Sequence, residues 1–292
     1  MLLREIKNIF HTELDTLYPK EEVDSFFYML IEDQLELERF VLAMEPNLII
    51  SKEEETPLFE ALSRLKLQEP IQHIIGTTHF MDMDFEVTSN VLIPRPETEE
   101  LVHWIIEEVH STKYEVRSRN TLKILDVGTG SGCIAISLAK NLPKAKVYAL
   151  DVSAEALEVA QKNAKLNNVD IDFLKDDILA LESMDTNFDI IVSNPPYVRE
   201  LEKKEMQTNV LEHEPDLALF VSDENPLVFY KGITAFAVKN LKENGLLFFE
   251  INQYFGKETE QLLKNHNFSE IELRKDMFGN DRMLKAMLHS SR

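Results

Sequence analysis

The fold of this chain is decided by the stretch Leu125-Asp126-Val127-Gly128-Thr129-Gly130-Ser131-Gly132. The apolar residues that end at Val127 predict a buried strand, and a segment with helical periodicity begins near Cys133. Glycines at alternate positions let the backbone between strand and helix turn sharply and approach a ligand closely. The amide N–H groups that open the helix then point at that ligand. A turn that serves only the backbone conformation is the alternative.

The spacing of these glycines indicates which ligand is bound. A dinucleotide-binding turn has the spacing G-x-G-x-x-G, whereas this turn reads G-x-G-x-G and has Asp126 two residues ahead of it. This arrangement favours S-adenosylmethionine over a dinucleotide. The cofactor-binding residues expected in the turn are Gly128, Thr129, Gly130, Ser131 and Gly132.

Strands and helices alternate from Glu97 onward, which predicts a parallel sheet covered by helices on both faces. The predicted strands are Lys123–Val127, Lys146–Asp151, Ile171–Lys175, Asp189–Ser193, Gly245–Ile251, Ile271–Lys275 and Met283–Leu288. The last two are close in the chain and are expected to form an antiparallel pair. The sequence therefore predicts an α/β fold with a Rossmann-like, seven-stranded, mostly parallel sheet.

Acidic residues follow the next two strands after the glycine turn. Asp151 lies about 20 residues beyond the turn, where an acid accepts hydrogen bonds from two ribose hydroxyls. Helix capping is the alternative for Asp151, because Ser153 and a helical segment follow it. Asp176 and Asp177 end the third strand and either meet an adenine amine or only form a turn. From the order along the chain, we expect Asp151 and Asp177 to bind the cofactor.

The fourth strand ends in Asn194-Pro195-Pro196-Tyr197, where two prolines make the exit from the strand rigid. The side-chain carbonyl of Asn194 and the backbone carbonyl of Pro195 provide two acceptors for a planar NH₂ group, and the Tyr197 ring provides a flat wall. This set suits a carboxamide or an exocyclic amine. A simple turn is the alternative. We expect Asn194, Pro195, Pro196 and Tyr197 to bind substrate, Asn194, Pro195 and Tyr197 to be catalytic, and Asn194 also to contact the cofactor.

The region before the sheet predicts a small helical bundle. Apolar residues have helical spacing up to Pro19, again over Val23–Ile31, over Leu35–Met44, and after Ser51, a predicted N-cap. A two-residue alternation over Phe80–Val87 follows, and Val91-Leu92-Ile93 comes after a Ser-Asn turn, so a β-hairpin is expected. The predicted domains are 1–72, a helical substrate-recognition domain, 73–95, a hairpin linker, and 96–292, the catalytic domain that binds S-adenosylmethionine.

The composition of the 292 residues excludes several classes of protein. A net charge of −21 argues against direct binding of nucleic acid, which depends on basic side chains. No apolar run approaches the roughly 18 residues of a membrane span, so no membrane association is expected. Cys133 is the only cysteine, which suits a reducing compartment, and no Cys/His spacing predicts a metal site. We expect a cytoplasmic monomer.

The motifs together resemble a known family. Asn194–Tyr197 combined with Asp126–Gly132 resembles class I S-adenosylmethionine-dependent amino-group methyltransferases. Leu92-Ile93-Pro94-Arg95-Pro96-Glu97-Thr98-Glu99, with Pro70–Gly76 and Asp276–Arg282, is similar to the release-factor glutamine methyltransferases, the HemK family. The resemblance implies methylation of the side-chain amide nitrogen of the glutamine in the Gly-Gly-Gln loop of peptide chain release factors.

Three points stay open from the sequence. Arg95 and Glu97 are expected to pair and fix the hairpin, either as structure or in contact with substrate. Asn-Pro-Pro-Tyr serves exocyclic base amines equally well, so a nucleic-acid adenine or guanine methyltransferase is the alternative enzyme, which the acidic charge disfavours. A non-catalytic S-adenosylmethionine sensor is the alternative outside the enzymes.

Overall fold

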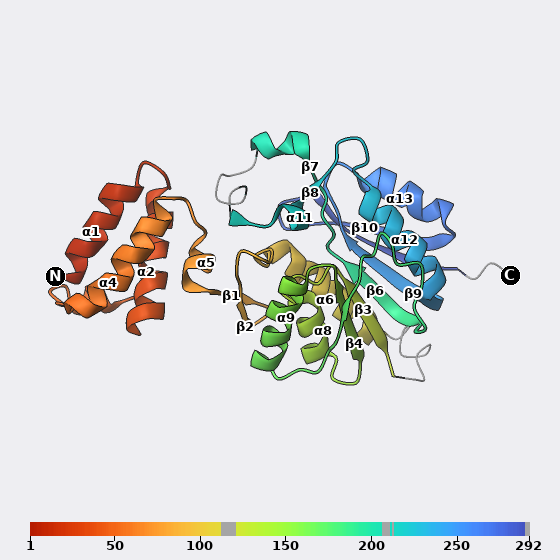
Figure 1. Cartoon of the computed structure of the whole chain (residues 1–292), viewed down its shortest axis with the longest axis horizontal. Helices are drawn as coiled ribbons and strands as arrows, with labels where there is room; N and C mark the ends of the chain where they lie inside the picture. The colour runs from red at the N-terminus through yellow and green to blue at the C-terminus, as the bar shows by residue number, and fades with distance from the viewer. Residues whose placement is uncertain (112–120, 206–210, 212, 290–292) are drawn as a thin grey trace. The chain divides into compact units, whose positions relative to one another are not determined.

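The computed structural model describes residues 1–111, 121–205, 211 and 213–289. The chain divides into two compact units, drawn in Figure 1. The first consists of Met1–Gly76 with Gln207–His213, and the second consists of Thr77–Met206 with Glu214–Arg292.

The first unit is a helical bundle. Its helices are α1 (Leu3–Leu14), α2 (Lys20–Leu35), α3 (Val41–Met44), α4 (Lys52–Leu65) and α5 (Ile71–Ile75). Apolar side chains from all but α3 fill its core, among them Phe10, Phe27 and Leu58. The predicted N-cap is confirmed, because the Ser51 side chain accepts from the backbone N–H of Glu54 and the Glu54 carboxylate accepts from that of Ser51.

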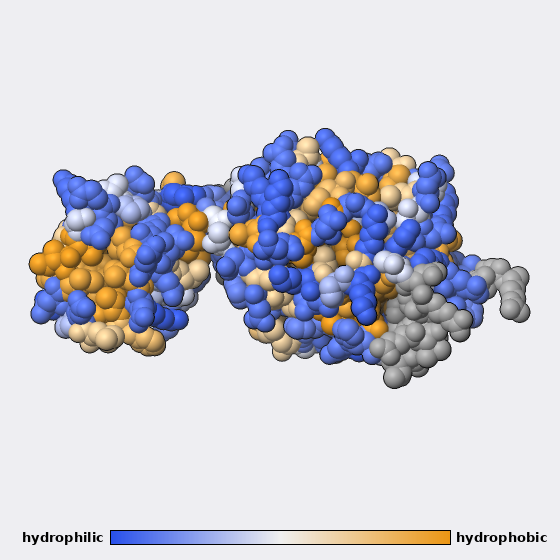
Figure 2. Space-filling view, turned by 90° about the horizontal axis from the view of Figure 1, so that it is seen from below, coloured by the Kyte–Doolittle hydropathy of each residue, from blue (hydrophilic) through white to orange (hydrophobic). Residues whose placement is uncertain are grey.

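One helix prediction in this unit is wrong over most of its length. Helix α2 ends at Leu35, and Glu36 adopts a left-handed φ of 54°, which turns the chain out of the helix. Of the predicted segment Leu35–Met44, only Val41–Met44 forms a further helix. Large apolar side chains stay exposed there, including Phe40 and Met44, and Figure 2 shows apolar residues gathered on one face of the first unit.

The predicted hairpin exists, but its turn lies elsewhere. Strand β1 (Thr77–Phe80) pairs antiparallel with β2 (Met83–Glu86). The turn is Met81-Asp82, where both residues have positive φ, as a two-residue hairpin turn of the right twist requires. Val91–Ile93, expected beyond a Ser-Asn turn, forms no strand. Both hairpin strands belong to the second unit.

The main sheet of the second unit confirms the predicted fold. In the described part of the chain it has seven strands in the order β10-β11-β9-β6-β3-β4-β5. These are β3 (Lys123–Val127), β4 (Lys146–Asp151), β5 (Asp172–Lys175), β6 (Phe188–Ser193), β9 (Leu241–Glu250), β10 (Phe268–Lys275) and β11 (Asp281–Leu288). Strands β6, β3, β4, β5 and β9 run parallel, and β10 and β11 form the expected antiparallel pair.

Helices cover both faces of this sheet (Figure 1). Successive strand residues alternate between two cores: Ile124 packs with α6 (Pro96–His110), α8 (Cys133–Asn141) and α9 (Ala154–Leu166), and Leu125 packs on the opposite face. That opposite core is closed by α12 (Val228–Asn240) and α13 (Gly256–Asn265). Burial on both faces explains why these strands read as continuous apolar runs in the sequence.

The strand register brings the ends of four strands to one edge. Val127 at the end of β3 pairs with Leu150 on β4 and with Ser193 on β6, and Asp151 pairs with Lys175 on β5. The residues that follow these strands are therefore neighbours. The strand order reverses at β3, and α/β sheets bind ligands at such a switch point.

Short elements follow strand β6. They are β7 (Val198–Arg199), the 3₁₀ helix η1 (Glu200–Glu205), α11 (Asp216–Leu219) and β8 (Phe220–Val221). Strands β7 and β8 form a small parallel pair that the sequence did not predict, because two-residue strands have no periodicity to detect. None of the helices in the described ranges has the length and apolarity that a bilayer crossing requires.

Candidate functional site

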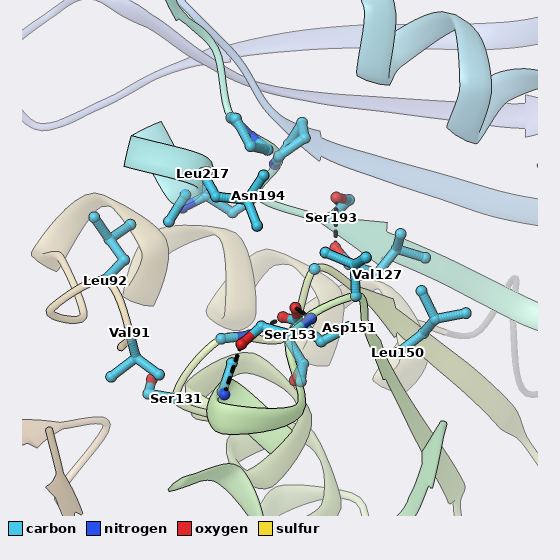
Figure 3. Close-up of a pocket in the computed structure, with 18 of the residues that line it drawn as sticks. Val91, Leu92, Val127, Ser131, Leu150, Asp151, Ser153, Ser193, Asn194 and Leu217 are labelled. Atoms are coloured by element: carbon cyan, nitrogen blue, oxygen red, sulfur yellow. Dashed lines mark hydrogen bonds between the residues drawn. The ribbon is translucent and has the colours of Figure 1, made fainter. Parts of the chain in front are cut away.

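A cavity of about 260 Å³ opens at the edge where the strands end (Figure 3). Its wall includes residues at the carboxyl ends of β3, β4 and β6, namely residues 128–131 of the glycine turn, Asp151 and Asn194. Segments from outside the sheet, Val91–Leu92 and Leu217, also contribute. Asp177, Pro195 and Pro196 line the cavity as well. Gly128 and Pro196, which lie 68 positions apart in the sequence (196 − 128 = 68), therefore share one cavity with the other predicted site residues, except Gly132 and Tyr197, which do not line it.

The glycine turn has the backbone conformation that only glycine adopts readily. Gly128, Gly130 and Gly132 have φ values of 74°, 54° and 84°. The backbone N–H groups of Gly128 and Thr129 donate to the carbonyl of Leu150, at 2.8 and 3.1 Å. Helix α8 then begins directly at the cavity, with Gly132 as its N-cap.

Replacing Gly132 with alanine will destabilise the protein by about 2–3 kcal/mol. The new Cβ would lie 2.9 Å from Ile136 Cδ1 and 3.1 Å from Ala160 Cβ, in addition to the strain of the positive φ. Gly279→Ala is the matched control, because its φ is +86° and nothing lies within 4 Å of the added Cβ. Urea unfolding should show a clearly smaller loss for the control. Equal losses would show that the contacts with α8 and α9 have no effect.

Asp151 is bonded to the glycine turn and does not cap the following helix. Its Oδ2 accepts from the N–H of Gly130 and its Oδ1 from the N–H of Ser153, both at 2.9 Å. Ser153 itself is the N-cap of α9, because its side chain accepts from the N–H of Ala156. Burial raises the pKa of Asp151, and these backbone hydrogen bonds oppose that rise. Each carboxylate oxygen keeps a lone pair for a further donor.

Asp126 lies fully buried under the glycine turn. Its Oδ2 accepts from the hydroxyl of Thr129 at 2.6 Å, so it holds the turn from below. Loss of hydration raises the pKa of the Asp126 carboxyl to about 7, although the Thr129 bond opposes the rise.

Asp126→Asn will change how stability depends on pH. Because the folded pKa of about 7 lies above the unfolded value of about 3.9, the folded state holds an extra proton between them. The stabilisation of the folded state by this proton on Asp126 is complete below about pH 4 and is lost as the pH rises through about 7. The neutral amide avoids this loss, so the free energy of unfolding of the variant relative to wild type should rise by about 2 kcal/mol between about pH 5 and pH 8. Urea unfolding at both pH values measures it, and a difference independent of pH would contradict the raised pKa.

Asn163 of α9 supports the glycine turn, a role that no motif in the sequence indicates. Its buried side-chain amide donates to the carbonyls of Ser131 and Glu86, each at 2.9 Å, and accepts from the N–H of Glu86 at 2.6 Å. The turn and strand β2 are thereby tied to one helix.

Asp177 has the contacts of a turn and also lines the cavity. Its Oδ1 accepts from the N–H of Leu179 at 2.9 Å, and its own N–H donates to the side chain of Asp176 at 2.9 Å. Both acids are cavity residues. A turn accounts for these hydrogen bonds, and the position of Asp177 on the cavity wall is compatible with contact to a bound ligand.

Only part of the Asn-Pro-Pro-Tyr motif lines the cavity. Asn194, Pro195 and Pro196 are cavity residues, whereas Tyr197 is absent from the described lining. The Tyr197 hydroxyl donates to Oε1 of Glu250 at 2.9 Å and accepts from Nη1 of Arg282 at 3.3 Å. Burial and the Glu250 charge hold the pKa of Tyr197 well above its usual value, so the hydroxyl keeps its proton.

The prediction that Arg95 pairs with Glu97 is wrong. The Arg95 guanidinium pairs with the buried carboxylate of Glu214, and no ion pair between Arg95 and Glu97 occurs among these described residues. Glu214 also accepts from the N–H of Ile93 at 3.2 Å. Since Arg95 and Pro215 both line the cavity, the pair joins two of its walls.

Four further residues of the site were not predicted as such: Thr98, Glu214, Glu250 and Arg282. Thr98 and Arg282 lie within the motifs that carry the family resemblance, which was the available signal. Glu250 follows the apolar run Leu246–Phe249, and an acid at the end of a buried strand is a second signal. In the part of the chain that the structure describes, His, Cys, Asp and Glu side chains form no group of three or more that could hold a metal ion.

Comparisons with known proteins agree with this architecture. A methyltransferase small domain model matches residues 113–219, and a PrmC N-terminal domain model matches residues 12–76. A methyltransferase from Pyrococcus furiosus is 16% identical, with a TM-score of 0.51 over 82% of this chain and 100% of that chain. This structural likeness shows the fold alone.

Curated relatives match over nearly the full length. A release factor glutamine methyltransferase of Flavobacterium psychrophilum is 53% identical over 98% of this chain and 99% of the relative. One of Bacteroides thetaiotaomicron, with the same name, is 43% identical over 94% of this chain and 95% of the relative.

Proposed function

The chain belongs to the release factor glutamine methyltransferase family, and we propose that it methylates the side-chain amide nitrogen of the glutamine in the Gly-Gly-Gln loop of peptide chain release factors. The observation that carries this proposal is the position of Asn194, Pro195 and Pro196 on the wall of a cavity shared with the glycine turn and Asp151. The cavity thus combines acceptors for a carboxamide with the groups expected to bind the methyl donor.

The residues present fit S-adenosylmethionine as the donor. The backbone N–H groups at the N-terminus of α8 suit the carboxylate of the cofactor. The two carboxylate oxygens of Asp151 keep lone pairs that can accept from two ribose hydroxyls. Asp177 and Ile178 lie on the same cavity and are proposed for the adenine side. When bound, S-adenosylmethionine supplies an activated methyl group.

The chain itself contributes mainly position and orientation. We assign the Oδ1 of Asn194 and the backbone carbonyl of Pro195 to the two protons of the substrate NH₂ group, which fixes the plane of the carboxamide. The two prolines keep these acceptors in place, because neither φ is free to change. Correct positioning of two reacting groups accounts for a large part of many enzymatic rate gains. Tyr197 is proposed to hold the end of the motif through its hydroxyl.

The first unit is proposed to help bind the release factor. Its exposed apolar side chains, such as Phe40, Met44 and Ile49, offer contact surface for a protein partner. We further propose that the protein works as a cytoplasmic monomer and does not bind nucleic acid directly. The net charge of −21 supports the last point, and the buried thiol of Cys133 suits a reducing compartment.

Isotopic methyl transfer tests the proposed function. The full-length protein is incubated with labelled S-adenosylmethionine and either a release factor, the same factor with the loop glutamine replaced by alanine, DNA, or ribosomal RNA. We expect label in the intact release factor alone. Label in DNA or RNA would support the nucleic-acid alternative, and binding of the cofactor without any transfer would support the sensor.

A further inference from the structure

Beneath the cavity, a buried carboxylate is linked to Asn194 through one hydroxyl. Glu250 and Thr98 are each 1% exposed. The Thr98 hydroxyl lies 2.7 Å from Oε2 of Glu250, and Nδ2 of Asn194 lies 3.3 Å from the same hydroxyl. The sheet register explains the proximity, because Ser193 on β6 pairs with Phe249 on β9, which makes Asn194 and Glu250 the next residues on adjacent parallel strands.

The direction of these hydrogen bonds follows from the donors available. The Thr98 hydroxyl donates its single proton to Oε2 of Glu250. The Thr98 oxygen can then only accept from Asn194, and this requires the NH₂ end of the carboxamide to face Thr98. The carbonyl end, Oδ1, is left without this partner and is available to the cavity that Asn194 and Thr98 both line.

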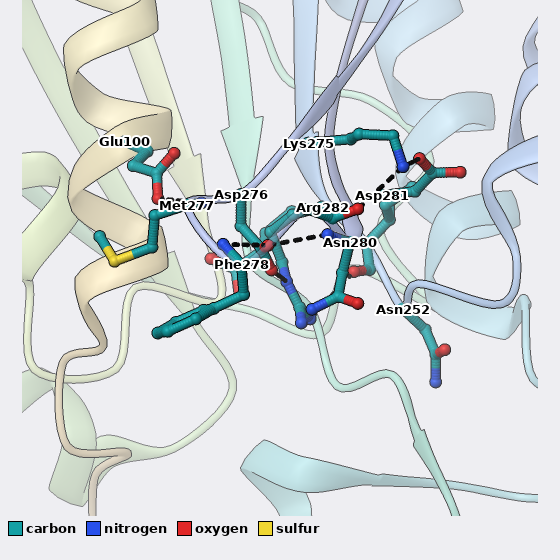
Figure 4. A network of polar contacts seen from close by, with 12 residues as sticks. Glu100, Asn252, Lys275, Asp276, Met277, Phe278, Asn280, Asp281 and Arg282 are labelled. Carbon is teal, nitrogen blue, oxygen red and sulfur yellow. Dashed lines mark hydrogen bonds and ion pairs between the residues drawn. The ribbon is translucent and has the colours of Figure 1, made fainter.

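The second oxygen of Glu250 is held by the other end of the motif. The Tyr197 hydroxyl donates to Oε1. Burial raises the pKa of Glu250, and the hydrogen bonds from Thr98 and Tyr197 and the positive charge of Arg282 oppose that rise. Arg282 is fixed in turn by the buried carboxylate of Asp276, at 3.1 Å, which also accepts from the N–H groups of Phe278 and Asn280 (Figure 4). Glu250 thus receives hydrogen bonds on both oxygens from residues in fixed positions.

We propose that Glu250 and Thr98 are positioning residues that set which end of the Asn194 carboxamide faces the substrate nitrogen. The inference rests on the proposed function, since it takes a substrate NH₂ group as the donor to Oδ1. It assigns a role to the hydroxyl of Thr98, which donates to one partner and accepts from another. Valine has the same shape and can do neither.

The test compares Thr98→Val with Thr98→Ser in the full-length protein. Without the hydroxyl, either end of the Asn194 carboxamide can face position 98. If Oδ1 faces position 98, the NH₂ group of Asn194 faces the NH₂ group of the substrate, and two donors cannot form a hydrogen bond. We expect T98V to lower kcat by about 10- to 100-fold. T98S keeps the hydroxyl and should stay within about 3-fold of wild type. The dissociation constant for S-adenosylhomocysteine and the KM for the release factor should change little in both variants.

A double-mutant cycle separates positioning from general destabilisation. If Thr98 acts through Asn194, T98V will have no further effect on kcat in an Asn194→Ala background. A loss of similar size in both backgrounds would overturn the proposal. Glu250→Gln provides a second variant, because the amide keeps the size of the side chain but can also donate to Thr98. We expect a lower kcat here too, and full activity would contradict the assignment of Glu250.

A spectroscopic readout makes the inference independent of activity. In protein labelled with ¹⁵N on asparagine, the side-chain NH₂ signals of Asn194 are those absent from the N194A spectrum. They are expected to shift in T98V and to stay in place in T98S. Unchanged signals in T98V would overturn the inference even if the wild type methylates release factors, whereas failure of methyl transfer by the wild type would refute the proposed function alone.

Discussion

Asn194→Ala will lower the turnover of glutamine methylation by about 100- to 1000-fold. The variant lacks one of the two acceptors proposed for the substrate NH₂ group, so the carboxamide can rotate away from the methyl donor. The remaining acceptor, the carbonyl of Pro195, belongs to the backbone and stays in place. Single-turnover transfer of labelled methyl groups to a release factor measures the loss.

Asn90→Ala is the matched control for this variant. Asn90 also lines the cavity, but its side chain belongs to an exposed residue and has no assigned role. We expect N90A to keep turnover within about 2-fold of wild type. In N194A, the affinity for S-adenosylhomocysteine should fall much less than turnover. Turnover near normal in N194A would exclude the role assigned to this residue.

Asp151→Ala will weaken cofactor binding by about 100-fold. The variant loses the two hydrogen bonds proposed between the ribose hydroxyls and Asp151, and the N–H groups of Gly130 and Ser153 also lose their acceptor. The effect should appear in the dissociation constant, and kcat at saturating cofactor should fall less. Titration calorimetry with S-adenosylhomocysteine measures the affinity directly.

Glu155→Gln is the control for the loss of a negative charge at this end of the cavity. Glu155 lines the cavity and contacts the Ser153 hydroxyl at 3.1 Å, but it is exposed. We expect E155Q to bind within about 3-fold of wild type, because exposed charges contribute little. A similar loss of affinity in both variants would show that the effect comes from net charge. Unchanged affinity in D151A would show that Asp151 does not bind the cofactor.

The strand ends were predictable because local sequence determines them. Buried parallel strands are continuous apolar runs, and the polar residue that ends each run marks the edge of the sheet, as at Asp151 and Asn194. Those two signals located the part of the cavity wall that the strand ends form. The order of the strands at the switch point followed from the general rule for such sheets rather than from any single residue.

The remaining features depend on contacts between distant residues. Arg95 pairs with Glu214, which lies 119 positions away, whereas the sequence suggested its neighbour Glu97. The Met81-Asp82 turn has no glycine or asparagine to signal it, and its positive φ values are imposed by the pairing of β1 and β2. Glu250 reads as the end of a strand until the register places it beside Asn194. Long-range pairing of this kind leaves no local periodicity.

The pairing of Arg95 with Glu214 has a consequence for how this enzyme can diverge. Loss of the Arg95 charge would leave the Glu214 carboxylate, whose side chain is 1% exposed, as an unpaired buried charge, so position 95 cannot lose its charge first without harm. A substitution that removes the charge at 95 should therefore occur across related proteins only together with a substitution at 214. The segments that contain Arg95 and Glu214 are far apart in the sequence, but this ion pair makes the evolution of one depend on the other.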